Sequence, residues 1–335
     1  MSQTLIPKNY HSRLSLYETQ EAIGIIKRTF SNALCKALNL KRVSAPLFVE
    51  TASGLNDNLN GTERPVRFDI AQTNAEVEVV HSLAKWKRMA LHHYGFSVGE
   101  GLYTDMNAIR RDEELDNLHS IYVDQWDWEK IITKDMRTLA TLKDAMQRIV
   151  TAICITNDML KWKYPALDVC LKREAVFATS QELEDRWPHK TPKERETAFL
   201  EETGTACILQ IGGKLKSGIP HDGRAPDYDD WQLNGDILFW DSTLNIAMEL
   251  SSMGIRVSPE SLSQQLQLSG CEDRRRLPFH RSVLSGSLPY TIGGGIGQSR
   301  MCMLLLQKAH IGEVQSSFWN EETRAYCQEN SITLL

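Results

Sequence analysis

A glycine-rich segment at residues 292–300, which reads IGGGIGQSR, carries the pattern with the most evident chemistry. It is expected to join a short strand, Tyr290–Ile292, to an apolar helix. Consecutive glycines let the backbone approach a ligand closely, and the start of a helix offers free N–H groups to anions. The planar guanidinium of Arg300 can grip a phosphate or stack on a base. A flexible turn is the simpler interpretation, but the combination favours nucleotide binding at Gly293, Gly294, Gly295 and Arg300.

Two carboxylates beside predicted strands are candidate ligands for a divalent cation. Asp236 opens a strand expected over Asp236–Trp240, and Glu249 lies in one expected over Ile246–Ser251. Carboxylate oxygens suit Mg²⁺ when a polyphosphate supplies further ligands. The acidic loop at residues 225–230, which contains Asp229, is more simply interpreted as a solvated surface loop.

Two polar residues interrupt the apolar face of a strand expected over His119–Glu129. The period of two places Gln125 and Asp127 on the same face as Ile121 and Val123. Polar groups on such a face cost free energy unless they are hydrogen-bonded. Either the protein satisfies them internally, or they line a pocket. In a pocket, Asp127 suits an ammonium group and Gln125 suits a small polar ligand.

The elements that must position these residues alternate between helices and hairpin-like strands. Apolar periodicity and capping residues predict helices over Leu16–Leu40, Ser82–Tyr94 and Thr138–Leu160, after Thr191 and after Ser258, and a last helix that begins near Gly297. Strands are also expected over Val43–Val49, Val66–Ile70, Glu76–Val80 and Ala206–Ile211. This order favours an α+β fold with a mostly antiparallel sheet over a doubly wound parallel fold. Because no Pro/Ser/Gly-rich linker divides the chain, we expect one domain over residues 1–335; the family resemblance described below implies that residues 1–10 are an extension.

Composition excludes several classes of protein. The 335 residues include 38 Lys and Arg and 43 Asp and Glu, and a net charge of −5 argues against a protein that coats nucleic acid. The start lacks the pattern of a signal peptide, and no apolar run approaches the ~20 residues of a membrane span. The seven cysteines show no CxxC spacing, which favours a reducing, cytoplasmic environment.

Three segments resemble the signature motifs of class II aminoacyl-tRNA synthetases. The segment that ends in Arg300 is similar to the third motif, Arg110 in the AIRRDE sequence at 108–113 is similar to the arginine of the second, and Val43–Pro46 is similar to the first, dimer-forming motif. From about residue 45 to 315 the chain closely resembles the ammonia-dependent asparagine synthetase A (aspartate–ammonia ligase) family. The segments that carry this resemblance are Asp57–Leu59, His81–Arg88, Gly99–Thr104, Tyr122–Glu129, Arg224–Trp231, Leu233–Leu238, Glu249–Val257 and Thr291–Arg300.

This resemblance implies an antiparallel sheet flanked by helices, a homodimer, and synthesis of L-asparagine from L-aspartate, ATP and ammonia through β-aspartyl-AMP. It implies that Arg110 and Arg300 are catalytic, and that Asp236 and Glu249 hold Mg²⁺. The residues implied to bind aspartate are Asp57, Ser82, Lys87, Gln125, Asp127, Ser252 and Arg256. Those implied to bind ATP or AMP are Arg110, Asp229, Asp236, Gly293, Gly294, Gly295, Ser299 and Arg300.

Alternatives to this function remain open in the sequence. Amidotransferases of the N-terminal nucleophile type expose a cysteine at position 2, whereas Ser2 stands here, and no SGGxDS pyrophosphatase loop is present. Free ammonia is therefore favoured over glutamine. A paralogue that acts on tRNA is one rival, although no appended anticodon-binding domain is evident. A non-catalytic binding protein is another, and it predicts loss of Arg110, Asp236, Glu249 or Arg300, all of which are present.

Overall fold

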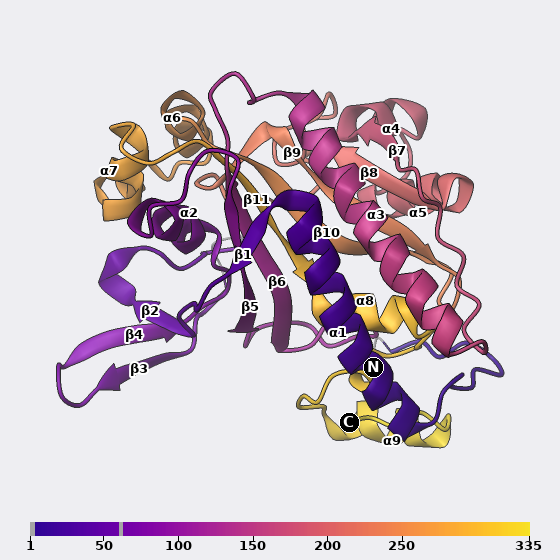
Figure 1. The fold of residues 1–335 in the computed structure, drawn as a ribbon. Helices are drawn as coiled ribbons and strands as arrows, with labels where there is room; N and C mark the ends of the chain where they lie inside the picture. The colour runs from indigo at the N-terminus through magenta and orange to yellow at the C-terminus, as the bar shows by residue number, and fades with distance from the viewer. Residues whose placement is uncertain (1–3, 60–62) are drawn as a thin grey trace.

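A computed structural model describes residues 4–59 and 63–335 (Figure 1). Ser2, on which the argument about the nitrogen source partly rests, lies outside these residues. The helices are α1 (Leu16–Leu38), α2 (Ala84–His93), α3 (Leu139–Lys163), α4 (Ser180–Arg186), α5 (Pro192–Thr203), α6 (Pro259–Leu268), α7 (Pro278–Leu284), α8 (Gln298–Leu305) and α9 (Glu321–Glu329), with 3-10 turns η1 (Thr51–Ser53), η2 (Glu272–Arg276) and η3 (Ile311–Glu313).

The strands form one large and one small sheet. The large sheet has the order β1-β5-β6-β11-β10-β9-β8-β7, and only its two edge pairs, β1 with β5 and β7 with β8, are parallel. The small sheet has the order β2-β4-β3 and is antiparallel. The strands are β1 (Leu40–Arg42), β2 (Phe48–Glu50), β3 (Arg67–Ile70), β4 (Ala75–Val79), β5 (Gly101–Ile109), β6 (Tyr122–Ile131), β7 (Val176–Thr179), β8 (Thr205–Leu209), β9 (Asp229–Asp241), β10 (Ile246–Arg256) and β11 (Thr291–Gly297). The predicted α+β fold with a mostly antiparallel sheet is confirmed.

Local capping explains where several helices begin. Ser15 accepts a hydrogen bond from the Glu18 backbone N–H, and the Glu18 carboxylate accepts one from the Ser15 backbone. Thr191 forms the same reciprocal box ahead of α5, where Pro192 occupies the first helical position. Across the described parts of the chain, no helix is both long and apolar enough to traverse a bilayer.

The main core lies between one face of the large sheet and the helices α1 and α3, which run side by side across it (Figure 1). Strand β6 turns Trp126 and Trp128 into this core, and the ring of Phe30 on α1 lies 4.6 Å from that of Trp126. Because side chains alternate along a strand, the same geometry turns Gln125 and Asp127 to the opposite face. The predicted alternation along this strand is confirmed.

Several predicted elements differ from the structure. The strand expected over Val43–Val49 is wrong: β1 and β2 are two short strands in different sheets, and residues 43–47 between them contain Pro46, which has no N–H to donate. The helix near Gly297 is not the last one, because α9 follows it. Strand β5 was not expected, and β9 begins at Asp229, so that part of the acidic loop is a strand.

The N-terminal residues pack against the C-terminal part of the chain. The backbone N–H of Leu5 donates to Asn117 Oδ1 at 2.7 Å, and the Tyr10 hydroxyl donates to Glu313 at 2.9 Å. The main core cluster draws on residues from Leu14 to Trp319. The division of the chain, one domain with an extension over residues 1–10, stays a prediction.

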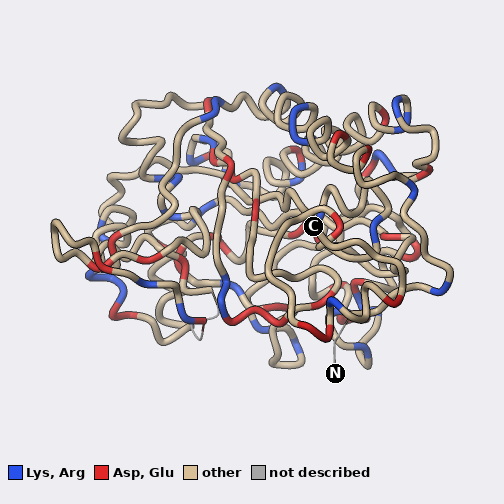
Figure 2. The backbone as a smooth tube through the Cα atoms, turned by 90° about the horizontal axis from the view of Figure 1, so that it is seen from below, with Lys and Arg blue, Asp and Glu red and all other residues tan. Residues whose placement is uncertain are grey.

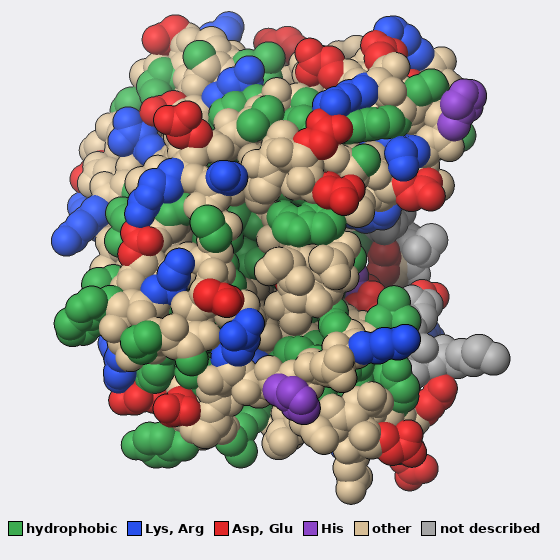
Figure 3. Space-filling view, turned by 90° about the vertical axis from the view of Figure 1, so that its right-hand side faces the viewer, with side chains coloured by type: hydrophobic (Ala, Val, Ile, Leu, Met, Phe, Trp, Pro, Cys, Tyr) green, Lys and Arg blue, Asp and Glu red, His purple; other side chains and the backbone are tan. Residues whose placement is uncertain are grey.

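Charged side chains of both signs are mixed over the surface. Seen from below, Lys and Arg alternate with Asp and Glu along the chain (Figure 2). The side that carries α4 and α5 shows the same mixture among polar and apolar groups (Figure 3). In the space-filling view of Figure 3, Lys and Arg side chains lie among Asp and Glu side chains.

Buried His310 is expected to make the protein acid-sensitive. Its Nδ1 accepts the Gly312 backbone N–H at 3.0 Å, its ring packs on Trp319, and burial lowers its pKa to about 4. Between about pH 6.5, the pKa of an unfolded histidine, and pH 4, the unfolded chain binds a proton that the folded chain does not. Stability present above pH 6.5 is therefore lost as the pH falls, by about 2 kcal/mol at pH 5.

Urea unfolding at pH 7 and pH 5 measures this loss. His310→Gln removes the titrating group and should show a smaller decrease in unfolding free energy between the two pH values. An equal decrease in the variant and the unaltered protein would contradict the assignment.

Candidate active site

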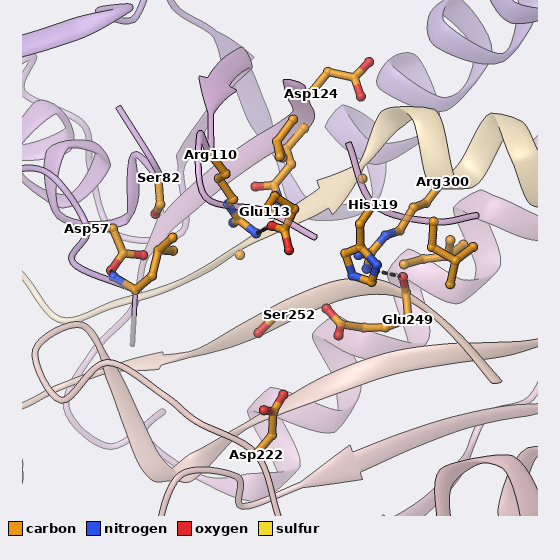
Figure 4. Close-up of a pocket in the computed structure, with 18 of the residues that line it drawn as sticks. Asp57, Ser82, Arg110, Glu113, His119, Asp124, Asp222, Glu249, Ser252 and Arg300 are labelled. Carbon is orange, nitrogen blue, oxygen red and sulfur yellow. Dashed lines mark hydrogen bonds and ion pairs between the residues drawn. The ribbon is translucent and has the colours of Figure 1, made fainter. Parts of the chain in front are cut away.

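A cavity of about 750 Å³ opens on the face of the large sheet opposite α1 and α3. Its walls come from the strands β6, β9, β10 and β11, the starts of α2 and α8, the first half of α5, and the loops at residues 110–120 and 222–228. In Figure 4, Asp57 and Ser82 lie at one end, Arg110 and Glu113 lie in the middle, and Arg300 and Glu249 lie at the other end. The two ends of the cavity therefore carry different polar side chains.

The glycine-rich segment is a strand rather than the predicted loop. Residues 291–297 form β11 in the middle of the large sheet, between β6 and β10, and α8 begins directly after it. The glycines are needed because neighbouring groups occupy the space of a side chain: a Cβ on Gly294 would lie 2.7 Å from the Ser252 carbonyl oxygen, and one on Gly295 would overlap Gln125. Gly294 and Gly295 line the cavity, whereas Gly293 does not.

Replacing Gly293 with alanine is expected to destabilise the protein. The added Cβ would overlap the Glu129 carboxylate and lie 2.6 Å from the Trp128 carbonyl oxygen, which is part of the sheet and cannot move away. Overpacking of this kind costs about 1–3 kcal/mol. Chemical denaturation measures the loss, with Gly213→Ala as the control, because a Cβ on Gly213 meets nothing within 4 Å. Equal stability of the two variants would contradict the expected clash.

One end of the cavity holds a buried ion pair. Lys87 Nζ donates to Asp127 Oδ1 at 2.5 Å and to the Gly294 carbonyl at 3.0 Å. Both side chains are at most 4% exposed. Burial lowers the pKa of Lys87, although Asp127 opposes this shift. The second oxygen, Asp127 Oδ2, is buried and has no hydrogen-bond partner among the described residues, so it is available to a ligand cation.

Arg256 forms the centre of a second buried network beside this pair. Its Nε and Nη2 donate to Glu129 at 3.0 and 2.7 Å, and its Nη1 donates to Asp229 at 2.5 Å. Burial opposes the charge of Arg256, but Glu129 and Asp229 raise its pKa. Burial raises the pKa of Asp229 despite Arg256. Asp229 thus lies with Arg256, and its predicted contact with ATP stays a prediction.

Four cations surround Glu249 at the other end of the cavity. Burial raises the pKa of this carboxyl, but the charges of Arg300, Arg224, Lys193 and Arg110 outweigh burial and lower it. Arg300 donates to the Glu249 backbone carbonyl at 3.3 Å (Figure 4). The Nε of Arg110 is buried without a hydrogen-bond partner among the described residues, and its Nη1 lies 3.9 Å from Glu113. A concentration of positive charge of this kind suits a ligand with several negative charges.

The two predicted magnesium ligands differ in their present contacts. Asp236 binds Arg224 through Oδ2, while its Oδ1 is buried without a partner in the described part of the chain. Burial raises the pKa of Asp236 to about 7, although Arg224 lowers it. The residues described include no group of three or more His, Cys, Asp or Glu able to hold a metal by themselves. The free Asp236 oxygen and nearby Glu249 fit a cation that also takes oxygens from a polyphosphate.

The cavity brings together most of the residues predicted from the sequence. Asp57 accepts the Leu59 backbone N–H at 2.9 Å, and the Ser299 hydroxyl donates to Asp124 at 2.6 Å. Of the predicted residues, only Asp236, which is bound by Arg224, and Gly293 do not line the cavity. Those that line it are Asp57, Ser82, Lys87, Arg110, Gln125, Asp127, Asp229, Glu249, Ser252, Arg256, Gly294, Gly295, Ser299 and Arg300.

Comparison with known proteins shows the family to which the chain belongs. A family model described as aspartate-ammonia ligase matches residues 17–331. A protein named aspartate–ammonia ligase from Clostridium perfringens strain SM101 is 60% identical over 336 residues, which cover 100% of each chain. One of the same name from Lactobacillus acidophilus strain NCFM is 59% identical and covers 99% of each chain. The chain belongs to the aspartate–ammonia ligase family. The predicted family is confirmed, and the protein is an enzyme of the ligase class that forms carbon–nitrogen bonds.

The fold of this chain is also similar to that of solved structures. Asparaginyl-tRNA synthetase from Pyrococcus horikoshii, complexed with asparaginyl-adenylate, matches with a TM-score of 0.65 at 15% identity, covering 94% of this chain and 74% of that one. Asparaginyl-tRNA synthetase from Entamoeba histolytica matches with a TM-score of 0.62 at 13% identity, covering 90% and 67%. At this identity the match shows the fold alone, and it confirms the predicted class II synthetase fold.

Sequence reasoning missed several residues in or beside this cavity. Glu129, which binds Arg256 beside the cavity, lies two positions after Asp127 on the same strand face, so the period of two could have found it. Lys193 lies within the capping box that begins α5, so the sequence pattern indicated only the start of a helix. Its place in the cavity wall was not predicted. Asp222 and Arg224 lie in a loop whose course the sequence pattern does not predict.

Proposed function

We propose that this protein makes L-asparagine from L-aspartate, ATP and ammonia and releases AMP and pyrophosphate. The full-length similarity to aspartate–ammonia ligases supports this function. The observation that carries it is the juxtaposition of two regions in one cavity. A buried Lys87–Asp127 pair with a free carboxylate oxygen suits a small zwitterion, and the cations around Glu249 suit a polyphosphate.

In the first step, the aspartate β-carboxylate attacks the α-phosphate of ATP. An oxygen–phosphorus bond forms, the bond to the β-phosphate oxygen breaks, and β-aspartyl-AMP and pyrophosphate result. Two anions must approach each other, so positive charge fixed at the reacting groups lowers the barrier. Arg110, in the middle of the cavity, and Arg300, at the end with Glu249, supply this charge. Asp236 and Glu249 would hold Mg²⁺, which would supply further positive charge when bound.

The other end of the cavity orients the aspartate. The free oxygen of Asp127 accepts a hydrogen bond from the substrate ammonium, and Asp57 adds a second carboxylate. Ser252 and the remaining N–H groups of Arg256 bind the α-carboxylate. Gln125 orients the amino acid, and Ser82 and Lys87 complete the pocket. This arrangement turns the β-carboxylate toward Arg110 in the middle of the cavity.

The nucleotide lies along the glycine strand. Gly294 and Gly295, which line the cavity, bring the backbone of β11 close to the adenosine, and Arg300 binds the phosphates or stacks on the adenine. Gly293 does not line the cavity and supports the strand by leaving space for Glu129. Ser299 and Asp229 complete the ATP contacts. In the second step, ammonia attacks the activated carbonyl carbon, the bond to the AMP oxygen breaks, and asparagine and AMP leave.

The proposal includes a cytoplasmic homodimer of single-domain chains that binds no nucleic acid. The acidic composition and the mixed charges in Figures 2 and 3 support the absence of a nucleic-acid partner.

The test is a reaction with aspartate, ATP, Mg²⁺ and ammonium in the absence of tRNA. We expect asparagine and AMP in equal amounts. Omission of ammonium should stop asparagine formation but leave aspartate-dependent ATP–pyrophosphate exchange. A requirement for tRNA, or ADP as the product, would contradict the proposal.

A further inference from the structure

Helix α5 places a lysine at the phosphate end of the cavity. The helix packs against β8, β9 and β10, and its first turns contribute Lys193, Glu196 and Thr197 to the cavity wall. Lys193 is the second residue of the helix, so the capping of α5 by Thr191 also sets where its side chain begins.

The ammonium of Lys193 forms an ion pair with Glu196, which in turn contacts a buried histidine. Its Nζ lies 3.0 Å from Glu196 Oε2, and Glu196 Oε1 lies 3.0 Å from His221 Nε2. The side chains of Glu196 and His221 are 7% and 1% exposed, whereas that of Lys193 is 71% exposed. Because the two inner groups are buried, they fix the position of the lysine while leaving its ammonium open to the cavity.

The charge of Lys193 acts on Glu249, as do the charges of the arginines in the cavity. It is one of the four cations that lower the pKa of Glu249 against burial, and Glu249 in turn is among the groups that raise the pKa of Lys193. Arg224, another of the four, is already bound to Asp236 and Asp222. Lys193 lines the cavity with an exposed side chain that forms an ion pair with Glu196.

We propose that Lys193 binds the pyrophosphate portion of the nucleotide, first as the β- and γ-phosphates of ATP and then as the released diphosphate. This inference rests on the proposed function. When the bond between the α-phosphorus and the bridging oxygen breaks, its electron pair stays on the β-phosphate, so the leaving group gains negative charge. An ammonium beside it stabilises that charge, while Arg110 acts at the α-phosphate.

The experiment is a calorimetric titration of the resting protein with pyrophosphate in the presence of Mg²⁺, without turnover. Lys193→Met should weaken pyrophosphate binding about tenfold, because a charge-assisted contact is lost, and should leave AMP binding within about twofold. Lys193→Arg should restore most of the affinity. Lys190→Met is the matched control: this lysine is exposed, lies three residues earlier and does not line the cavity, so the variant should bind pyrophosphate normally.

The same variants can be compared in aspartate-dependent ATP–pyrophosphate exchange, where Lys193→Met should raise the KM for pyrophosphate about tenfold. Unchanged pyrophosphate affinity in a folded Lys193→Met protein would overturn the inference. An equal loss of pyrophosphate and AMP affinity would also overturn it, because that result indicates a general effect on the cavity. If the unaltered protein makes asparagine while Lys193→Met binds pyrophosphate normally, only the inference fails. If the unaltered protein makes no asparagine, the proposed function fails.

Discussion

Arg110→Ala is expected to reduce aspartate-dependent ATP–pyrophosphate exchange by about 10³-fold or more, with little change in folding. The loss of one fixed group that stabilises developing charge commonly costs 10²–10³ in rate, and an arginine at a transferring phosphoryl group costs more. The geometry favours a large effect because Arg110 is weakly held: its Nε has no partner among the described residues, and its nearest carboxylate oxygen, on Glu113, is 3.9 Å away. Its charge is thus available to a ligand.

Arg111→Ala is the matched control, since Arg111 is the next residue, is exposed and does not line the cavity. It should retain exchange within a fewfold of the unaltered protein. Thermal unfolding of both variants distinguishes a lost catalytic group from a misfolded protein. Near-normal exchange in Arg110→Ala would remove Arg110 from the proposed mechanism.

Arg256→Ala is expected to be the most destabilising single substitution in the site, with a loss of about 3–5 kcal/mol of unfolding free energy. Arg256 is 3% exposed and neutralises Glu129 and Asp229, whose side chains are 0% and 4% exposed. Without the guanidinium, two carboxylates remain buried without their counter-ion. Arg256→Lys keeps the charge but not the two-pronged geometry, so its loss should be intermediate.

Arg186→Ala provides the comparison for an exposed pair. Arg186 lies 2.7 Å from Glu202, and both side chains are about half exposed. Pairs of this kind contribute about 0–1 kcal/mol. Chemical denaturation of both variants at pH 7 measures the difference. A loss below about 1 kcal/mol in Arg256→Ala would mean that Glu129 and Asp229 find other partners or take up protons.

Most of the residues that the sequence singled out line the cavity, although their roles stay predictions. The period of two along residues 119–129 placed Gln125 and Asp127 on one strand face, because alternation depends only on strand geometry, but it left open whether they line a pocket. The glycine strand was assigned to a loop because glycine is uncommon in strands, and the need for glycine there comes from Glu129, Gln125 and Met253 of neighbouring strands. Those contacts are between strands that are far apart in the chain.

The contacts of individual charged residues were also beyond prediction from sequence. Asp236 and Glu249 were singled out by their places in apolar strands, but nothing local shows that Arg224 binds Asp236. Lys193 lies in the first turn of α5, where the sequence pattern indicates only a capped helix start. Only the packing of α5 against β9 and β10 brings it to the cavity.

The transfer of label from aspartate to AMP tests the proposed chemistry most directly. Aspartate with ¹⁸O in its β-carboxylate is incubated with ATP, Mg²⁺ and ammonium, and the nucleotide and phosphate products are examined by mass spectrometry. Attack of the β-carboxylate on the α-phosphate predicts AMP that carries one ¹⁸O atom, with unlabelled pyrophosphate. Labelled orthophosphate together with ADP would show attack on the γ-phosphate and would contradict an adenylate intermediate.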